Sequence, residues 1–82
     1  MAGYHVNEIV KGELGKSSKI QEELDELKDA EEQGVKILVL CELADIVGAI
    51  EAYLKANCPG FGLHDLHQMA KLTSEAFKVG QR

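Results

Sequence analysis

The sequence predicts an all-α fold, in which an antiparallel helical hairpin, a third helix and a short N-terminal arm join into a helical bundle through oligomerisation. Apolar residues recur at helical spacing over most of the 82 residues, and glycine or proline ends each such stretch. The middle stretch is apolar nearly all round, which is typical of a helix that packs on several sides. A chain this short buries only about 60% of its unfolded surface, so we expect a second copy to supply the missing neighbours.

The composition narrows the class of protein. A hydrophobic share of 45% and a charged share of 28% are typical of one folded domain, and the formal charge of −5 opposes binding to a nucleic-acid backbone. Two cysteines and no visible signal peptide favour a reducing, cytoplasmic location. The apolar stretch 35–54 is long enough to span a bilayer, but its charged residues make a membrane partner unexpected: Lys36, Glu42, Asp45 and Glu51.

Residues 1–16 form the arm, and residues 17–82 form the all-α domain. A short alternation of apolar and polar residues over 4–10, followed by Gly12 and Gly15, predicts an extended arm or a hairpin. Tyr4 and His5 in this arm have two possible uses, stacking on a nucleotide base or packing against a second copy of the chain.

The first helix is expected over residues 17–33. Ser17 or Ser18 is the expected N-cap, and Gly34 is the expected stop. The positions that recur at helical spacing are Ile20, Leu24, Leu27 and Ala30. Most acids of this helix are read as solvent-facing charge: Glu22, Asp25, Asp29, Glu31 and Glu32.

Two further helices follow. The second spans 35–57 and stops before Pro59, and its tight join to the first predicts an antiparallel pair. The third spans 63–79 and stops at Gly80. One face of the third helix carries Leu66, Met69, Ala70, Thr73 and Phe77.

Two pairs of carboxylates stand out from the apolar pattern. Glu23 falls inside the apolar arc of the first helix and Glu26 lies on its edge, while Glu42 and Asp45 share one face of the apolar second helix. Two like charges about 4 Å apart repel by about 4 kcal/mol at an effective dielectric constant of 20. A positive group is therefore expected between them, either a Lys or Arg side chain or a divalent cation. An oxygen-only donor set suits Mg²⁺ or Mn²⁺.

The same residues carry a resemblance to a known family. Residues 22–26 (EELDE) and 42–45 (ELAD), separated by fifteen residues, resemble the EExxE…ExxD signature of the all-α nucleoside triphosphate pyrophosphohydrolases, the MazG-like group. The resemblance covers residues 19–54. It implies homodimers or homotetramers that bind Mg²⁺ and cleave a nucleotide between its α- and β-phosphates, releasing a monophosphate and pyrophosphate. By position it implies metal ligands at Glu23, Glu26, Glu42 and Asp45, and catalytic roles for Glu22 and Glu23.

Other functional residues and other functions stay open at this point. Weak candidates for phosphate contacts are Lys16, Lys19, Lys71, Lys78 and Arg82. Cys58, His64 and His67 fit a zinc site less well than surface positions, because a fourth ligand is missing. Part of the nucleotide pocket is expected to come from a partner subunit, since only about sixteen residues precede the motif helix. The alternatives to an enzyme are a non-catalytic protein that sequesters a nucleotide and a structural oligomer whose lysines neutralise the acids.

Overall fold

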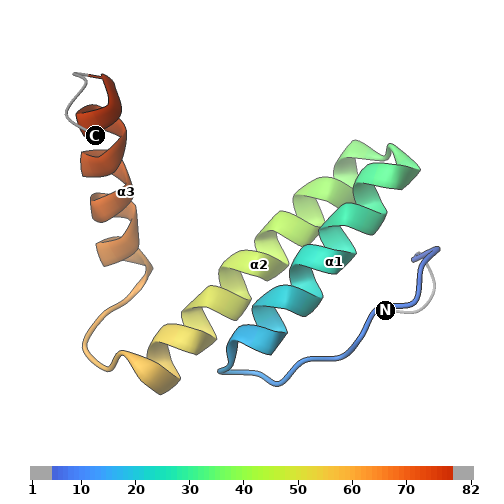
Figure 1. The fold of residues 1–82 in the computed structure, drawn as a ribbon, viewed down its shortest axis with the longest axis horizontal. Coiled ribbons are helices and arrows are strands. Elements are labelled where there is room, and N and C mark those ends of the chain that lie inside the picture. The colour runs from blue at the N-terminus through green and yellow to red at the C-terminus, as the bar shows by residue number, and fades with distance from the viewer. Residues whose placement is uncertain (1–4, 79–82) are drawn as a thin grey trace.

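The computed structural model describes residues 5–78, and all regular structure in this part of the chain is helical (Figure 1). The helices are α1 (Ser17–Gln33), α2 (Lys36–Asn57) and α3 (Leu63–Lys78). The all-α prediction is therefore confirmed. Residues 5–13 are extended or irregular and contain no strand, so within the described residues the arm is not a hairpin.

The bounds of α1 match the prediction, but its N-cap does not. Gly34 ends the helix in the left-handed conformation, with φ of 72°, and its N–H donates to the carbonyls of Ala30 and Glu31. The predicted serine cap is wrong, because Lys16 is the N-cap and no side chain caps the helix. The Lys16 carbonyl already accepts the Lys19 N–H at 3.1 Å, which places both serines inside the first turn.

The other two helices agree closely with their predicted spans. Val35 is the N-cap of α2 and not its first residue, and the helix ends at Asn57 as expected. The Asp65 carboxylate accepts the Gly62 N–H at 2.8 Å and so stabilises the start of α3. The predicted last residue of the third helix and its stop, Val79 and Gly80, lie outside the described residues.

Helices α1 and α2 pack side by side along their length (Figure 1). The end of α2 lies beside the start of α1, because the Asn57 side chain donates to the Gly15 carbonyl at 2.7 Å. Over residues 5–75, the buried apolar side chains are few, namely Ala30, Ala49 and Leu54. The other buried residues in this range are acidic: Glu22, Glu23, Glu26, Asp29 and Glu42. The interior that orders this helical pair is therefore largely polar.

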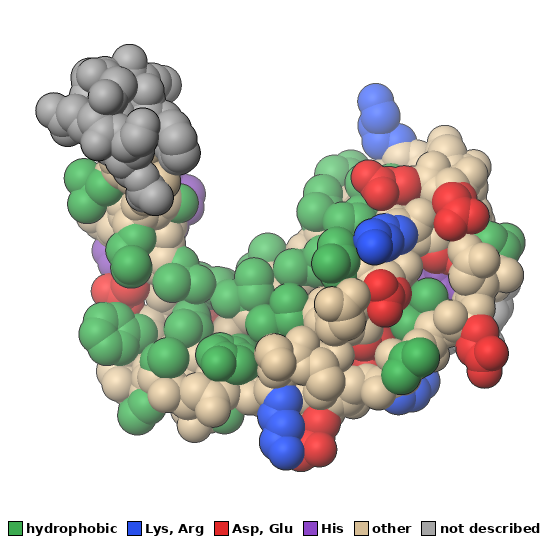
Figure 2. Space-filling model, viewed as in Figure 1, with side chains coloured by type: hydrophobic (Ala, Val, Ile, Leu, Met, Phe, Trp, Pro, Cys, Tyr) green, Lys and Arg blue, Asp and Glu red, His purple; other side chains and the backbone are tan. Residues whose placement is uncertain are grey.

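Much of the apolar surface of α2 faces away from α1. The side chains of Ile37, Leu40, Leu43 and Val47 are between 44% and 63% exposed, although the sequence predicts a helix packed on several sides. Helix α3 does not cover them, since it stands away from the helical pair in Figure 1. Figure 2 shows hydrophobic side chains gathered over the middle of the molecule. One chain thus leaves α2 half covered, and none of the described helices has the length and apolar character of a membrane span.

Candidate metal centre

The N-terminal arm runs along α1 and is held there by main-chain hydrogen bonds to carboxylates. The Gly12 N–H donates to Glu22 at 2.8 Å, and the Asn7 and Val6 N–H groups donate to Asp29 at 2.7 and 3.0 Å. Glu22 and Asp29 are consequently only 3% and 1% exposed. The prediction that these two acids face solvent is wrong. Helical periodicity gives no sign of the arm, so the pattern alone places both acids on the outer surface of the helix.

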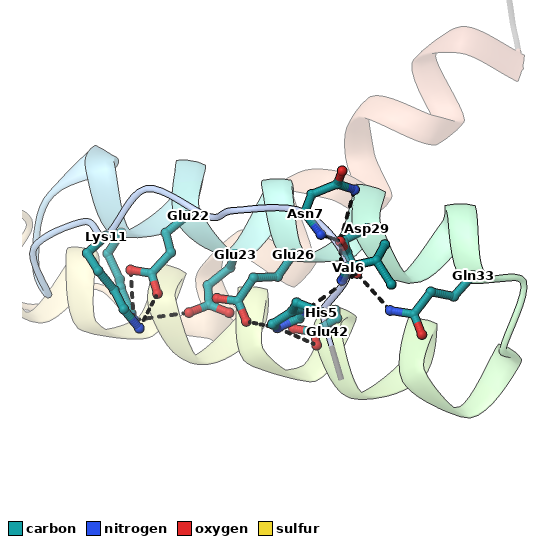
Figure 3. Close-up of polar contacts among 11 residues, drawn as sticks. His5, Val6, Asn7, Lys11, Glu22, Glu23, Glu26, Asp29, Gln33 and Glu42 are labelled. Atoms are coloured by element: carbon teal, nitrogen blue, oxygen red, sulfur yellow. Dashed lines mark hydrogen bonds and ion pairs between the residues drawn. The ribbon is translucent and has the colours of Figure 1, made fainter. Parts of the chain in front are cut away.

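His5 enters the cluster of acids from this arm (Figure 3). Its Nε2 lies 2.7 Å from Glu26 Oε1 and 3.9 Å from Glu42 Oε2, and its Nδ1 lies 3.4 Å from Asp29 Oδ1. The imidazole is only 8% exposed. From the sequence, His5 is expected to stack on a base or to pack on a second copy, and the structure instead buries it among three carboxylates of its own chain. Tyr4 lies outside the described residues.

Carboxylates from both helices meet below the arm. Oxygens of Glu23, Glu42 and Asp45 lie within 4.8 Å of one another, and a second group of oxygens within this limit comes from Glu22, Glu23 and Glu26. The structure thus brings together the four acids that the resemblance implies as ligands, although not all in one group. Glu42 is 1% exposed and Glu23 is 6% exposed, whereas Asp45 is exposed.

Two oxygens in this cluster have no hydrogen-bond partner among the described residues. They are Glu23 Oε1 and Glu42 Oε1, and both are buried. An unpartnered buried carboxylate oxygen costs free energy, because it has lost its hydration without a replacement. Burial accordingly raises the pKa of Glu42, and the neighbouring Glu26 and Asp45 add to this effect. Burial also raises the pKa of Glu23.

Lys19 supplies part of the positive charge that the sequence analysis expects. Its Nζ lies 3.1 Å from Glu23 Oε2 and 3.2 Å from Glu22 Oε1. The hydrogen bond to Glu23 raises the pKa of Lys19. Glu22 differs from its neighbours, because the Gly12 N–H lowers the pKa of this carboxyl group. Lys19 therefore holds one oxygen of Glu23 and leaves the other facing the cluster.

The remaining phosphate-contact candidates lie away from the carboxylates or outside the described residues. Lys16 pairs with Glu13 at 3.3 Å, and Lys71 is exposed on α3. The Lys78 side chain and Arg82 are not described. Lys11, which the sequence analysis does not single out, lies nearer, with its Nζ 3.9 Å from Glu22 Oε2. His64 and His67 are exposed at the start of α3, as expected for surface histidines.

A cavity of about 240 Å³ opens between the arm and α1. Its lining includes His5, Lys11, Glu22 and Glu26. Ligand pockets usually measure about 300–1,000 Å³, so this cavity admits water or an ion more readily than a whole nucleotide.

The donor set fits a hard divalent cation. Such ions take carboxylate oxygens as ligands, and the centre offers buried oxygens of Glu23 and Glu42 that lack hydrogen bonds, with Asp45 beside them. A cation bound there would remove both the mutual repulsion of the acids and the cost of the two unpartnered oxygens. No protein-family model, curated protein or solved structure that was compared with the chain matches it.

Proposed function

We propose that this protein is a Mg²⁺-dependent nucleoside triphosphate pyrophosphohydrolase. One observation carries the proposal: carboxylates from two adjacent helices converge, and two of their buried oxygens lack any hydrogen-bond donor among the described residues. The EExxE…ExxD resemblance of residues 22–45 supplies the reaction class. In this proposal Glu23, Glu42 and Asp45 bind Mg²⁺, or Mn²⁺ in its place. Glu26 is the fourth acid of this ligand set.

The proposed chemistry needs no covalent intermediate. When bound, the ion neutralises the triphosphate and polarises its phosphorus. Glu22 suits the task of orienting a water molecule, because the Gly12 N–H favours its ionised form. The oxygen of that water bonds to the α-phosphorus. The bond between the α-phosphorus and the oxygen that bridges the α- and β-phosphates breaks, and pyrophosphate leaves. Glu22 or Glu23 takes the proton from the water.

The nucleotide pocket in this proposal is shared between subunits. The cavity beside the acids is too small for a nucleotide, and Lys19 is the one predicted phosphate contact among the described residues that lies at the carboxylates. The exposed apolar face of α2 supports self-association, as a homodimer or a homotetramer. A partner subunit would then supply the walls that surround the base and sugar.

The test is a turnover assay. Wild-type protein is incubated with a panel of nucleoside triphosphates and Mg²⁺, and the released pyrophosphate is measured beside Glu42→Gln. We expect turnover in the wild type, a loss of at least about 100-fold in Glu42→Gln, and no turnover in EDTA. The matched control is Glu51→Gln, which changes an exposed acid of the same helix and should keep activity within about twofold.

A non-catalytic protein that sequesters a nucleotide is the second candidate. Lys19 and the arm already contact several of the acids, so the cluster has partners even without substrate. Tight binding of a nucleotide without turnover in the same panel would favour this candidate. If neither binding nor turnover is found, the proposed enzyme is wrong and the structural oligomer of the sequence analysis is the better description.

A further inference from the structure

His5 extends the centre beyond an oxygen-only site. Its Nε2 and one oxygen each of Glu26 and Glu42 lie within 4.8 Å of one another. We infer that His5, Glu26 and Glu42 form a mixed nitrogen and oxygen site for a divalent transition metal such as Zn²⁺ or Co²⁺. This site differs from the proposed Mg²⁺ site, because it adds His5 and does not use Glu23 or Asp45. Glu26 and Glu42 belong to both sets of acids.

The orientation of the imidazole supports metal binding. Histidines that bind metals commonly donate their second ring N–H to a carboxylate, which fixes the ring and aims the other nitrogen at the ion. Asp29 Oδ1 lies 3.4 Å from His5 Nδ1, which is an ion-pair contact and not a hydrogen bond, while Nε2 is hydrogen-bonded to Glu26 and lies 3.9 Å from Glu42 Oε2 (Figure 3). Asp29 is itself held by the Gln33 side chain at 2.7 Å and by the N–H groups of Val6 and Asn7. The carboxylate beside Nδ1 is thus fixed independently of the ring, and a small turn of the imidazole would let Nδ1–H donate to it.

Glu42 gives the second, independent indication. Its carboxylate is 1% exposed, and its Oε1 has no hydrogen-bond partner among the described residues. Its Oε2 lies 3.9 Å from His5 Nε2, which is too far for a hydrogen bond. Zinc ligands lie about 2.0–2.2 Å from the ion. Two ligand atoms of one tetrahedral zinc ion are therefore roughly 3.3 Å apart. The 2.7 Å between His5 Nε2 and Glu26 Oε1 is a hydrogen bond whose proton an incoming metal ion would displace, and the 3.9 Å from Nε2 to Glu42 Oε2 is longer than this value.

The donor set determines the class of metal. An imidazole nitrogen with two carboxylates favours borderline ions, whereas Mg²⁺ prefers oxygen ligands alone. The expected order of affinity is Zn²⁺ above Co²⁺, then Mn²⁺, with Mg²⁺ last. The adjoining cavity of about 240 Å³ leaves room for water as a further ligand.

Calorimetry on the untagged full chain tests the site with Zn²⁺ and Co²⁺ alone. We expect the wild type to bind Zn²⁺ at least about tenfold more tightly than Mg²⁺, and His5→Ala to weaken Zn²⁺ binding by about 10- to 100-fold. The matched control is His67→Ala, which removes an exposed histidine of α3 and should leave Zn²⁺ affinity within about threefold. Asp45→Asn should also leave Zn²⁺ binding within about threefold, while it weakens Mg²⁺ binding. The two sites are thereby separated, and the result does not depend on nucleotide turnover.

A measurement on the wild type covers the case in which His5→Ala does not fold. In protein labelled with ¹⁵N at histidine, Zn²⁺ should shift the Nε2 resonance of His5 and leave those of His64 and His67 in place. Equal Zn²⁺ affinity in folded His5→Ala and wild type would overturn the proposal. A shift confined to His64 and His67 would overturn it as well.

Discussion

Glu42 combines two properties that oppose each other, full burial and a carboxyl group that can ionise. Its folded-state pKa is raised above 4.5, first by burial and then by the neighbouring acids. The native state therefore holds the proton more tightly than the unfolded chain does. Because of this linkage, the contribution of Glu42 to stability is greatest below the unfolded pKa and is lost as the pH rises through the folded pKa.

Replacing Glu42 with Gln should stabilise the metal-free protein. At pH 7 in EDTA we expect the free energy of unfolding to rise by on the order of 1 kcal/mol, because the cost of burying an ionisable carboxyl group is removed. Urea denaturation measures it, with Glu51→Gln as the exposed control. In the wild type the stability should fall as the pH rises above 4.5, and this slope should be smaller in Glu42→Gln. A variant less stable than the wild type at pH 7 would contradict this account of Glu42.

The arm is the element that depends most on single side chains of another element. Asp29 accepts the N–H groups of Val6 and Asn7, and its pKa is lowered because these donors and Gln33 together outweigh the opposing effect of burial. A lowered pKa means that this contribution is present above the unfolded value of 3.8 and is lost as the pH falls through the folded value.

Asp29→Asn should release the N-terminal part of the arm while α1 and α2 stay folded. Hydrogen exchange at the Val6 and Asn7 amides measures this, and we expect exchange at least about tenfold faster than in the wild type at pH 7. Asp25→Asn is the matched control, since Asp25 lies on the same helix and contacts Gln21 in place of the arm. Unchanged exchange in Asp29→Asn would show that other contacts hold the arm.

The elements differ in how far the sequence predicts them. The bounds of α1 follow from apolar spacing and from Gly34, which are local signals within the helix and at its end. The arm has no such signal, because its hydrogen bonds join main-chain N–H groups to carboxylates 10 to 23 residues away, as between Gly12 and Glu22 or between Val6 and Asp29. The convergence of Glu23 with Glu42 could be expected from the helical pair, whereas the entry of His5 could not.

At the scale of the whole molecule, the exposed face of α2 is where the structure differs most from the sequence prediction of a helix packed on several sides. Ile37, Leu40, Leu43 and Val47 fall on one side of the helix, opposite the buried Glu42 and Ala49. Exposed apolar patches of this kind mark contact surfaces. The buried apolar core of one chain is small, so the prediction of self-association from chain length and composition still stands as a prediction.

Leu40→Glu should reduce the oligomeric state. We expect the wild type to sediment as a multiple of the 9.0 kDa chain and Leu40→Glu to sediment as a monomer, because a charge in an apolar interface is left without a partner. Analytical ultracentrifugation at several concentrations measures this. Gln21→Glu adds the same charge at an exposed position of α1 and should leave the mass unchanged. A wild type that stays monomeric at every concentration would contradict the prediction.

The way the arm is anchored sets which of its residues are free to vary. Val6, Asn7 and Gly12 each use the main-chain N–H, which every amino acid except proline carries, so most substitutions at Val6 keep this hydrogen bond. The His5 ring and the Asn7 side-chain amide also contact acids, so these two side chains matter for the anchoring. A Cβ at Gly12 would clash with the Ser18 carbonyl oxygen, so this position has to stay glycine. Among homologues we therefore expect wide variation at Val6, glycine at position 12, no proline at the anchored positions, and a histidine wherever the mixed site is retained.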